Sequence, residues 1–437
     1  MVRVAVADSD LLDYLSNLNS SKTCTIGLIL GQSMGKKDFV VHLAKTMPTL
    51  TEKTATAFKN IADIPDGVVA DHAKHTTRML PGGIYILGIF LVTEEHVLNP
   101  LSAKVKSILR HMHSTLSKHE LLYGKSAENA EQLVLHYNKK SNTYTATTYC
   151  LESSTCTPAE FNFNSKDLAW EHLECFYEVN ETVLITDRNL SIKDELKKIA
   201  RKINNCLRTG IYLFNGQVRS KEDSLVILKK MKMSKAELTD AEDKPVSVSI
   251  LMPLNCTSSI INAETVNAKG FLKITGLICS NVWLHPKYNF KKASDAIHED
   301  IIRSLTSRLS MHFDSLTEGE GNYNDSSSIH EPPRRVLIPL SGSKVMLTDY
   351  LFPGEGVEET VLSLQDILDI TIQTKSAIKD VEGPVDLAEY YNEMSEGGSN
   401  EVLPNMAADT NKFMYIIGTA IALLVLILSL LVHFLKD

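Results

Sequence analysis

The alternation of apolar and polar residues in the first third of the chain predicts short strands and helices. Apolar and β-branched residues fill 24–30 and 38–44 on either side of a polar turn, which is the pattern of a β-hairpin. The run GIYILGIFLVT at 83–93 is long and apolar enough for a strand buried on both faces. The other elements expected here are helices at 11–18 and 101–119 and a second hairpin at 133–137 and 144–151. Residues 1–156 are therefore predicted to form an α+β domain.

A second block of similar composition covers residues 157–316. Residues 270–284 predict a long strand, and 293–313 repeat isoleucine and leucine at helical spacing. The other elements expected in this block are strands at 183–186 and 246–252 and a helix at 192–207. A second α+β domain is the simplest interpretation. A strand that contains glycines and precedes a long helix also occurs in the first block, so a degenerate duplication is the alternative.

The last part of the body is less regular. Residues 317–330 are polar and rich in glycine and serine, so we expect a mobile loop. Residues 331–378 regain apolar runs, which predict a strand pair and a helix packed on the body. Residues 379–412 are acidic and interrupted by glycine and proline, as expected of a flexible tether.

A single long apolar run follows this tether. From Phe413 to Leu435 the chain has no acidic or basic side chain, and as a helix the run would be roughly 35 Å long. That length exceeds the hydrocarbon core of a bilayer, so we predict one transmembrane helix. Because the run lies at the end of the chain and residues 1–10 are too charged for a secretory signal, we expect post-translational insertion as a tail anchor. The bulk of the chain would then be cytosolic and the C-terminus lumenal.

Composition narrows the classes of partner. The formal net charge of −8 argues against nucleic acid, because binding to phosphates needs a basic face. The seven cysteines form no Cys-x-x-Cys pair, which favours reduced thiols over a zinc site or a disulfide framework. No cofactor is expected. Several Asn-x-Ser/Thr sequons are present, and in a cytosolic body they would remain unused.

The first domain resembles the MPN fold of the JAMM-type zinc isopeptidases. The resemblance rests on the run GLILGQ, the strand and helix that follow it, and the hairpin LVLHYNKKSNTYTATTY. Active members of that superfamily have a glutamate, two histidines and an aspartate where this chain has Cys24, Leu91, Thr93 and approximately Lys104. Without the three metal ligands and the carboxylate base, the resemblance implies a catalytically dead MPN-like scaffold.

The pair His111 and His113 does not replace these ligands. Residues two apart on a helix point about 200° apart and cannot share a metal ion. The cysteines lack a local nucleophile motif, and the segment GQSMGKKD lacks the spacing of a phosphate-binding loop. We therefore expect no enzyme activity. A membrane-anchored hydrolase of the MPN or cysteine type is the alternative. A SNARE-type tether is disfavoured, because glycine and proline interrupt the stretch before the apolar run.

Three segments carry a closer resemblance. KTCTIGLILGQSMGKKDFVVHLAKTMP near the start, PRRVLIPLSGSKVMLTDYLFPGE near the end and the terminal apolar run resemble the odorant-response-abnormal protein four family. This resemblance implies an adaptor of the endoplasmic-reticulum membrane that supports folding and trafficking of seven-helix receptors. It also implies a partner, a ubiquitin-fold-modifier-specific cysteine protease held at that membrane. No catalytic residue is implied.

A docking surface is expected on the body of such an adaptor. The candidates are Arg334, Arg335 and Val336 in the most specific segment of the resemblance, together with the solvent edges of the N-terminal sheet. For Arg334 and Arg335, the favoured alternative to a docking role is that they are solvated side chains at the flank of a strand.

Overall fold

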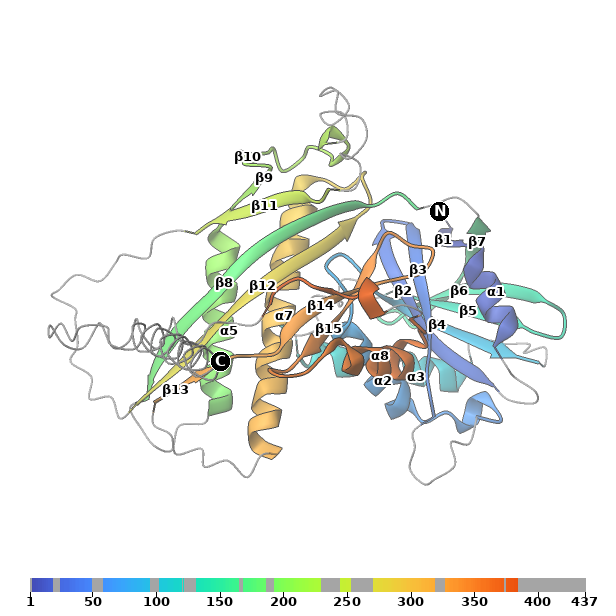
Figure 1. Cartoon of the computed structure of the whole chain (residues 1–437). Coiled ribbons are helices and arrows are strands. Elements are labelled where there is room, and N and C mark those ends of the chain that lie inside the picture. Colours follow the sequence, from blue (N-terminus) through green and yellow to red (C-terminus); the bar gives the residue numbers. More distant parts are fainter. Residues whose placement is uncertain are drawn as a thin grey trace, which may run out of the picture. The chain divides into compact units, whose positions relative to one another are not determined.

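The computed structural model confirms the mixed α+β class and shows how the two blocks meet (Figure 1). It describes residues 2–18, 24–48, 58–94, 102–119, 121, 131–164, 168–185, 192–228, 244–252, 270–318, 327–372 and 375–383. Met1–Val385 form one compact unit.

The N-terminal block is a closed barrel in which the strands follow the order β1-β3-β2-β4-β5-β6-β7. The strands are β1 (Arg3–Asp8), β2 (Thr25–Met34), β3 (Lys37–Lys45), β4 (Tyr85–Thr93), β5 (Glu131–Asn138), β6 (Thr143–Cys150) and β7 (Cys156–Asn164). Both predicted hairpins and the buried strand are confirmed. Two strands were not predicted. These are β1 and β7, whose parallel pairing closes the barrel and extends this sheet past residue 156.

Helices pack on both faces of the barrel strands. They are α1 (Asp10–Asn17), α2 (Asp66–Arg78) and α3 (Ala103–Ser117), with a short 3-10 turn at Ile61–Asp63. Of these helices, α2 and α3 lie on one face and α1 lies on the other. The sequence predicted α1 and α3 but not α2, whose segment is mostly polar and has only Val69, Ala70 and Ala73 as apolar residues on its buried face. On α3, Met112 is buried between His111 and His113, as the helical spacing requires.

The second block is a six-stranded sheet with the order β10-β9-β11-β8-β12-β13. The strands are β8 (Glu171–Ile185), β9 (Ile211–Phe214), β10 (Gln217–Val218), β11 (Val246–Leu251), β12 (Gly270–Leu284) and β13 (Ser327–His330). Two helices, α5 (Ile192–Thr209) and α7 (Phe290–Glu318), pack on one face of this sheet (Figure 1). Residues 327–330 were predicted as part of a loop. That prediction is wrong, because they pair with β12 in parallel.

A three-stranded sheet joins the two blocks. It consists of β15 (Met346–Leu351), β14 (Arg334–Pro339) and β16 (Lys379–Asp380), and α8 (Val357–Leu368) follows β15. The predicted strand pair and helix are confirmed. A 3-10 turn at Lys375–Ala377 leads into β16. The prediction that the tether begins at residue 379 is wrong, because Lys379 and Asp380 are paired with β14.

No helix in the described ranges is long and apolar enough to cross a bilayer. The predicted anchor, from Phe413 to Leu435, and the tether beyond Gly383 lie outside the described residues.

Candidate functional site: the open face of the six-stranded sheet

The two faces of the six-stranded sheet differ in what covers them. Along β8 the side chains of Leu173, Cys175 and Val179 point toward α5 and α7 and are buried. Side chains alternate between faces along a strand, so the intervening residues of β8 point the opposite way. Phe176 and Leu184 are among these, and they are 54% and 53% exposed. We call this second surface the open face.

Neighbouring strands continue the apolar character of the open face. The pairing register aligns Leu251 of β11 with Ile211 of β9, and Leu213 of β9 with Val218 of β10. Ile211, Val218 and Leu251 are each more than half exposed. Large apolar side chains gathered on one exposed surface mark interaction sites more often than single exposed ones do. The open face is therefore the candidate docking surface of the described residues.

One end of the open face is closed by the barrel. His172 of β8 stacks on Trp283 of β12 with ring centroids 4.3 Å apart, and Trp283 is buried in the core shared with the barrel. Gln32 of β2 donates hydrogen bonds to the carbonyl oxygens of Gly83 and Trp283 at 2.8 and 3.0 Å. These contacts join the sheet to the barrel.

At the edge of β12, some backbone hydrogen-bonding groups are paired with side chains and not with a neighbouring strand. The N–H of Cys279 donates to the carboxylate of Glu382 at 2.7 Å. The guanidinium of Arg308 donates to the carbonyl oxygen of Leu277 at 3.1 Å, and it also pairs with Glu382 at 2.6 Å. A sheet edge capped in this way cannot accept another strand. Partners are therefore excluded from this stretch of β12.

A buried ion pair lies next to this edge. The guanidinium of Arg335 binds both carboxylate oxygens of Asp300 at 2.7 and 3.0 Å, and Arg303 also contacts Asp300 at 3.2 Å. Burial raises the pKa of Asp300, but the two arginines outweigh it and hold this pKa below its usual range. Both partners of the Arg335–Asp300 pair stay charged, and each neutralises the other in a site without solvent.

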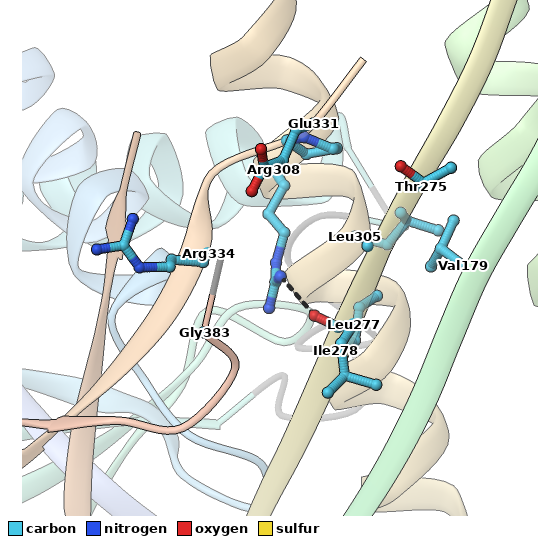
Figure 2. Close-up of a pocket in the computed structure, with 11 residues that line it drawn as sticks. Val179, Thr275, Leu277, Ile278, Leu305, Arg308, Glu331, Arg334 and Gly383 are labelled. Carbon is cyan, nitrogen blue, oxygen red and sulfur yellow. Dashed lines mark hydrogen bonds between the residues drawn. The ribbon is translucent and has the colours of Figure 1, made fainter. Parts of the chain in front are cut away.

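A small pocket opens between β12, α7 and β14 (Figure 2). Leu277, Arg308 and Gly383 contribute to its lining, and Figure 2 shows the hydrogen bond from Arg308 to Leu277. Its volume of about 20 Å³ is close to that of one water molecule. The pocket is thus too small for an organic cofactor.

The three predicted docking residues do not act together as a surface. Arg335 and Val336 are fully buried, so neither can contact a docked partner. The alternative, in which Arg335 is a solvated side chain at the flank of a strand, also does not fit, because Arg335 is buried. Arg334 is half-buried, pairs with Asp380 at 2.9 Å and donates to the carbonyl oxygen of Glu355 at 3.0 Å. The segment 334–336 therefore stabilises the junction between the blocks.

The residues at the positions of the isopeptidase ligands contribute to the structure of the barrel block. Cys24, Leu91 and Thr93 are buried, and Lys104 pairs with Asp66 at 2.7 Å. The described residues contain no group of three or more histidine, cysteine or acidic side chains placed to hold a metal ion. The MPN-like fold of residues 1–156 stays a prediction.

The buried thiols are poor nucleophiles. Burial raises the pKa of Cys24, Cys175 and Cys279 to about 12, so these three thiols are protonated at neutral pH. A protonated thiol does not attack a carbonyl group. The buried environment of these three cysteines therefore does not favour nucleophilic catalysis by their thiols.

Known proteins resemble the chain over most of its length. The protein odr-4 homolog of Homo sapiens is 28% identical over 389 residues, which cover 85% of this chain and 84% of that protein. Odorant response abnormal protein 4 of Caenorhabditis elegans is 21% identical over 78% of this chain and 71% of that protein.

Among solved structures, the crystal structure of UfSP from C. elegans has a TM-score of 0.47 and 12% identity, and it covers 84% of this chain. The chain spans 57% of that protein's length. The model of the family described as "ODR4-like: Odorant response abnormal 4-like" matches residues 27–379. That match includes the barrel from β2 onward, the six-stranded sheet and the three-stranded sheet that joins the two blocks. The chain therefore belongs to the ODR4-like family.

Proposed function

We propose that the protein is a non-enzymatic, tail-anchored adaptor of the endoplasmic-reticulum membrane. In this role it supports the folding and trafficking of seven-helix receptors and recruits a ubiquitin-fold-modifier-specific cysteine protease to the membrane. The observation that carries the proposal is the family match over residues 27–379, nearly all of the described body. The anchor is the apolar run from Phe413 to Leu435, and the body faces the cytosol.

An adaptor needs a location, a tether and a docking surface, and the chain offers a candidate for each. The apolar run would supply the location. The acidic stretch beyond Gly383, about 30 residues long, would give a reach of about 30 Å by random-coil scaling. The open face would supply the docking surface. Confining a protease beside its membrane substrates raises their rate of encounter without any new contact to those substrates.

Affinity purification from detergent-solubilised membranes tests this function. The full chain is compared with a version that ends at Lys412, and the protease is measured by quantitative mass spectrometry. We expect the protease with both versions, because docking belongs to the body. We expect receptor delivery to the cell surface only with the full chain, because delivery requires the anchor.

Two results would contradict the proposal. Recovery of the protease with neither version would rule out recruitment. Cleavage of a ubiquitin-like conjugate by the purified protein alone would replace the adaptor with the hydrolase alternative.

A further inference from the structure

Lys106 and Arg110 form a pair of neighbouring cations on α3 without a counter-charge. Residues four apart on a helix lie side by side, and like charges at this spacing destabilise the helix. Both side chains lie against the ring of Tyr149 on β6, with the Lys106 Nζ 5.8 Å and the Arg110 guanidinium 5.7 Å from its centroid. In the part of the chain that the structure describes, neither cation forms an ion pair, whereas Lys104 of the same helix pairs with Asp66 at 2.7 Å. An anion placed beside the two cations would therefore stabilise this side of α3.

The turn that joins β6 to β7 brings hydroxyl groups to this place. Residues 152–155 are exposed, and the backbone N–H of Cys150 closes the turn by donating to the carbonyl oxygen of Thr155 at 3.0 Å. Ser154 has a φ of 56°, in the left-handed region that residues other than glycine seldom adopt. Its Oγ accepts a hydrogen bond from the Arg110 guanidinium at 3.0 Å. An exposed hydroxyl is thus held against a cation that lacks an acidic partner.

Ser154 differs from the other hydroxyl residues of this turn. The hydroxyl groups of Ser153 and Thr155 bond to each other at 2.7 Å. The carboxylate of Glu152, in the same turn, forms no ion pair among the described residues. A phosphoryl group on the Ser154 oxygen would carry about −1.5 to −2 charge at neutral pH, and its oxygen atoms would match the fork of a guanidinium. Such a group would supply the anion that Lys106 and Arg110 lack.

We propose that Ser154 is a phosphorylation site, and that Arg110 and Lys106 bind its phosphoryl group. In the modification, the Ser154 Oγ attacks the γ-phosphorus of ATP bound to a protein kinase. The bond to the ADP leaving group breaks, and the hydroxyl proton passes to a base of the kinase. The product ties the turn to α3 through charge-assisted hydrogen bonds. Phosphorylation thus strengthens the contact between the β6–β7 hairpin of the barrel and α3.

Phosphorus NMR of the full chain in detergent tests how the two cations bind the phosphoryl group. Phosphoserine is introduced at position 154 during translation, and its second pKa is measured by a pH titration. This pKa is about 6 in an unperturbed phosphoserine. We expect it to be about 5.5 or lower at position 154, because the cations favour the dianion. The double variant Lys106→Gln/Arg110→Gln should bring it back to about 6.

Phosphoserine at position 153 is the matched control, since the Ser153 hydroxyl contacts Thr155 and not a cation. Its pKa should be the same with and without the double variant. A pKa at position 154 that the double variant does not change would overturn the inference. Binding of inorganic phosphate to the unmodified full chain that Arg110→Gln abolishes would also overturn it, since the cations would then serve a free anion.

Mass spectrometry of the chain isolated from the cells that produce it, with phosphatases inhibited, tests whether the modification occurs. We expect phosphate on Ser154. Recovery of the peptide that contains residues 153–155 only in its unmodified form would overturn the inference. Phosphate on Ser153 or Thr155 and not on Ser154 would do the same, because neither hydroxyl bonds to Arg110.

Discussion

Two arginines that are adjacent in sequence have opposite environments. Arg335 is fully buried and binds Asp300 through two hydrogen bonds, whereas Arg334 is half-buried on the other side of the same strand and pairs with Asp380. Alternation along β14 places the Arg335 side chain against α7 and the Arg334 side chain on the opposite side of the strand. The sequence RRV predicts two exposed cations, but the strand separates them.

Replacing each arginine by methionine should separate the two roles. Arg335→Met leaves Asp300 charged and buried with only Arg303 nearby, so we expect the free energy of unfolding to fall by about 3 kcal/mol or more. Arg334→Met removes a partly exposed pair and should cost less than about 1 kcal/mol. Urea unfolding of the full chain in detergent measures both. Equal losses would show that the buried pair does not stabilise the fold.

At the scale of elements, the end of α8 is held by two histidines from the barrel block. The carbonyl oxygen of Leu368 accepts from Nε2 of His42 at 2.9 Å, and that of Ile367 accepts from Nε2 of His72 at 2.6 Å. The last carbonyl groups of a helix lack partners within it, so these rings cap the helix. Burial lowers the pKa of His72 to about 4 and also lowers that of His42.

This arrangement predicts a loss of stability in mild acid. In the unfolded chain the pKa of histidine is about 6.5. In the folded chain the pKa of His72 is about 4, so the unfolded state binds this proton more tightly. Folding stability is therefore lost as the pH falls from about 6.5 toward 4. Lowering the pH from 7 to 5 should reduce the free energy of unfolding by about 2 kcal/mol through His72 alone.

His72→Gln keeps an amide donor for the helix end and removes the titration. Its unfolding free energy should therefore depend less on pH than that of the unmodified chain. His111→Gln, at an exposed position of α3, is the matched control and should leave the pH dependence unchanged. Thermal unfolding followed from pH 7 to pH 5 gives both comparisons. An identical pH dependence in the His72→Gln chain would contradict this role.

At the scale of the whole molecule, the blocks are joined by residues from the end of the body. Glu382 accepts from Cys279 in the six-stranded sheet, from Arg308 on α7 and from the backbone N–H of Arg335 on β14. One carboxylate thus connects three elements. The body ends where this connection is made.

Truncation on either side of Glu382 tests this connection. A chain that ends at Val381 loses the carboxylate and leaves Arg308 buried without its acid, so we expect a loss of about 3 kcal/mol or more. A chain that ends at Val385 keeps Glu382 and should match the stability of the full body. Differential scanning calorimetry compares the two. Equal melting temperatures would refute the connecting role.

Local periodicity was enough to identify the elements that carry one clear pattern. Both hairpins of the barrel, the strand at β12 and the helices α3, α5 and α7 were predicted close to their observed bounds. β8 was mostly missed. Its inward residues, such as Leu173, and its outward residues, such as Phe176, are both apolar, and glutamates interrupt them, so no alternation is visible. The open face was hidden for the same reason.

The sequence by itself determined the α+β class, the main hairpins, the strand–helix pairs and the family resemblance, because each depends on residues close together in the chain or on a continuous motif. Only the tertiary structure decided that β1 and β7 close a barrel, that Arg335 is buried against Asp300, and that exposed apolar side chains share one face of the six-stranded sheet. These features depend on which distant segments supply a partner strand, a counter-charge or a covering helix. No local pattern encodes that choice.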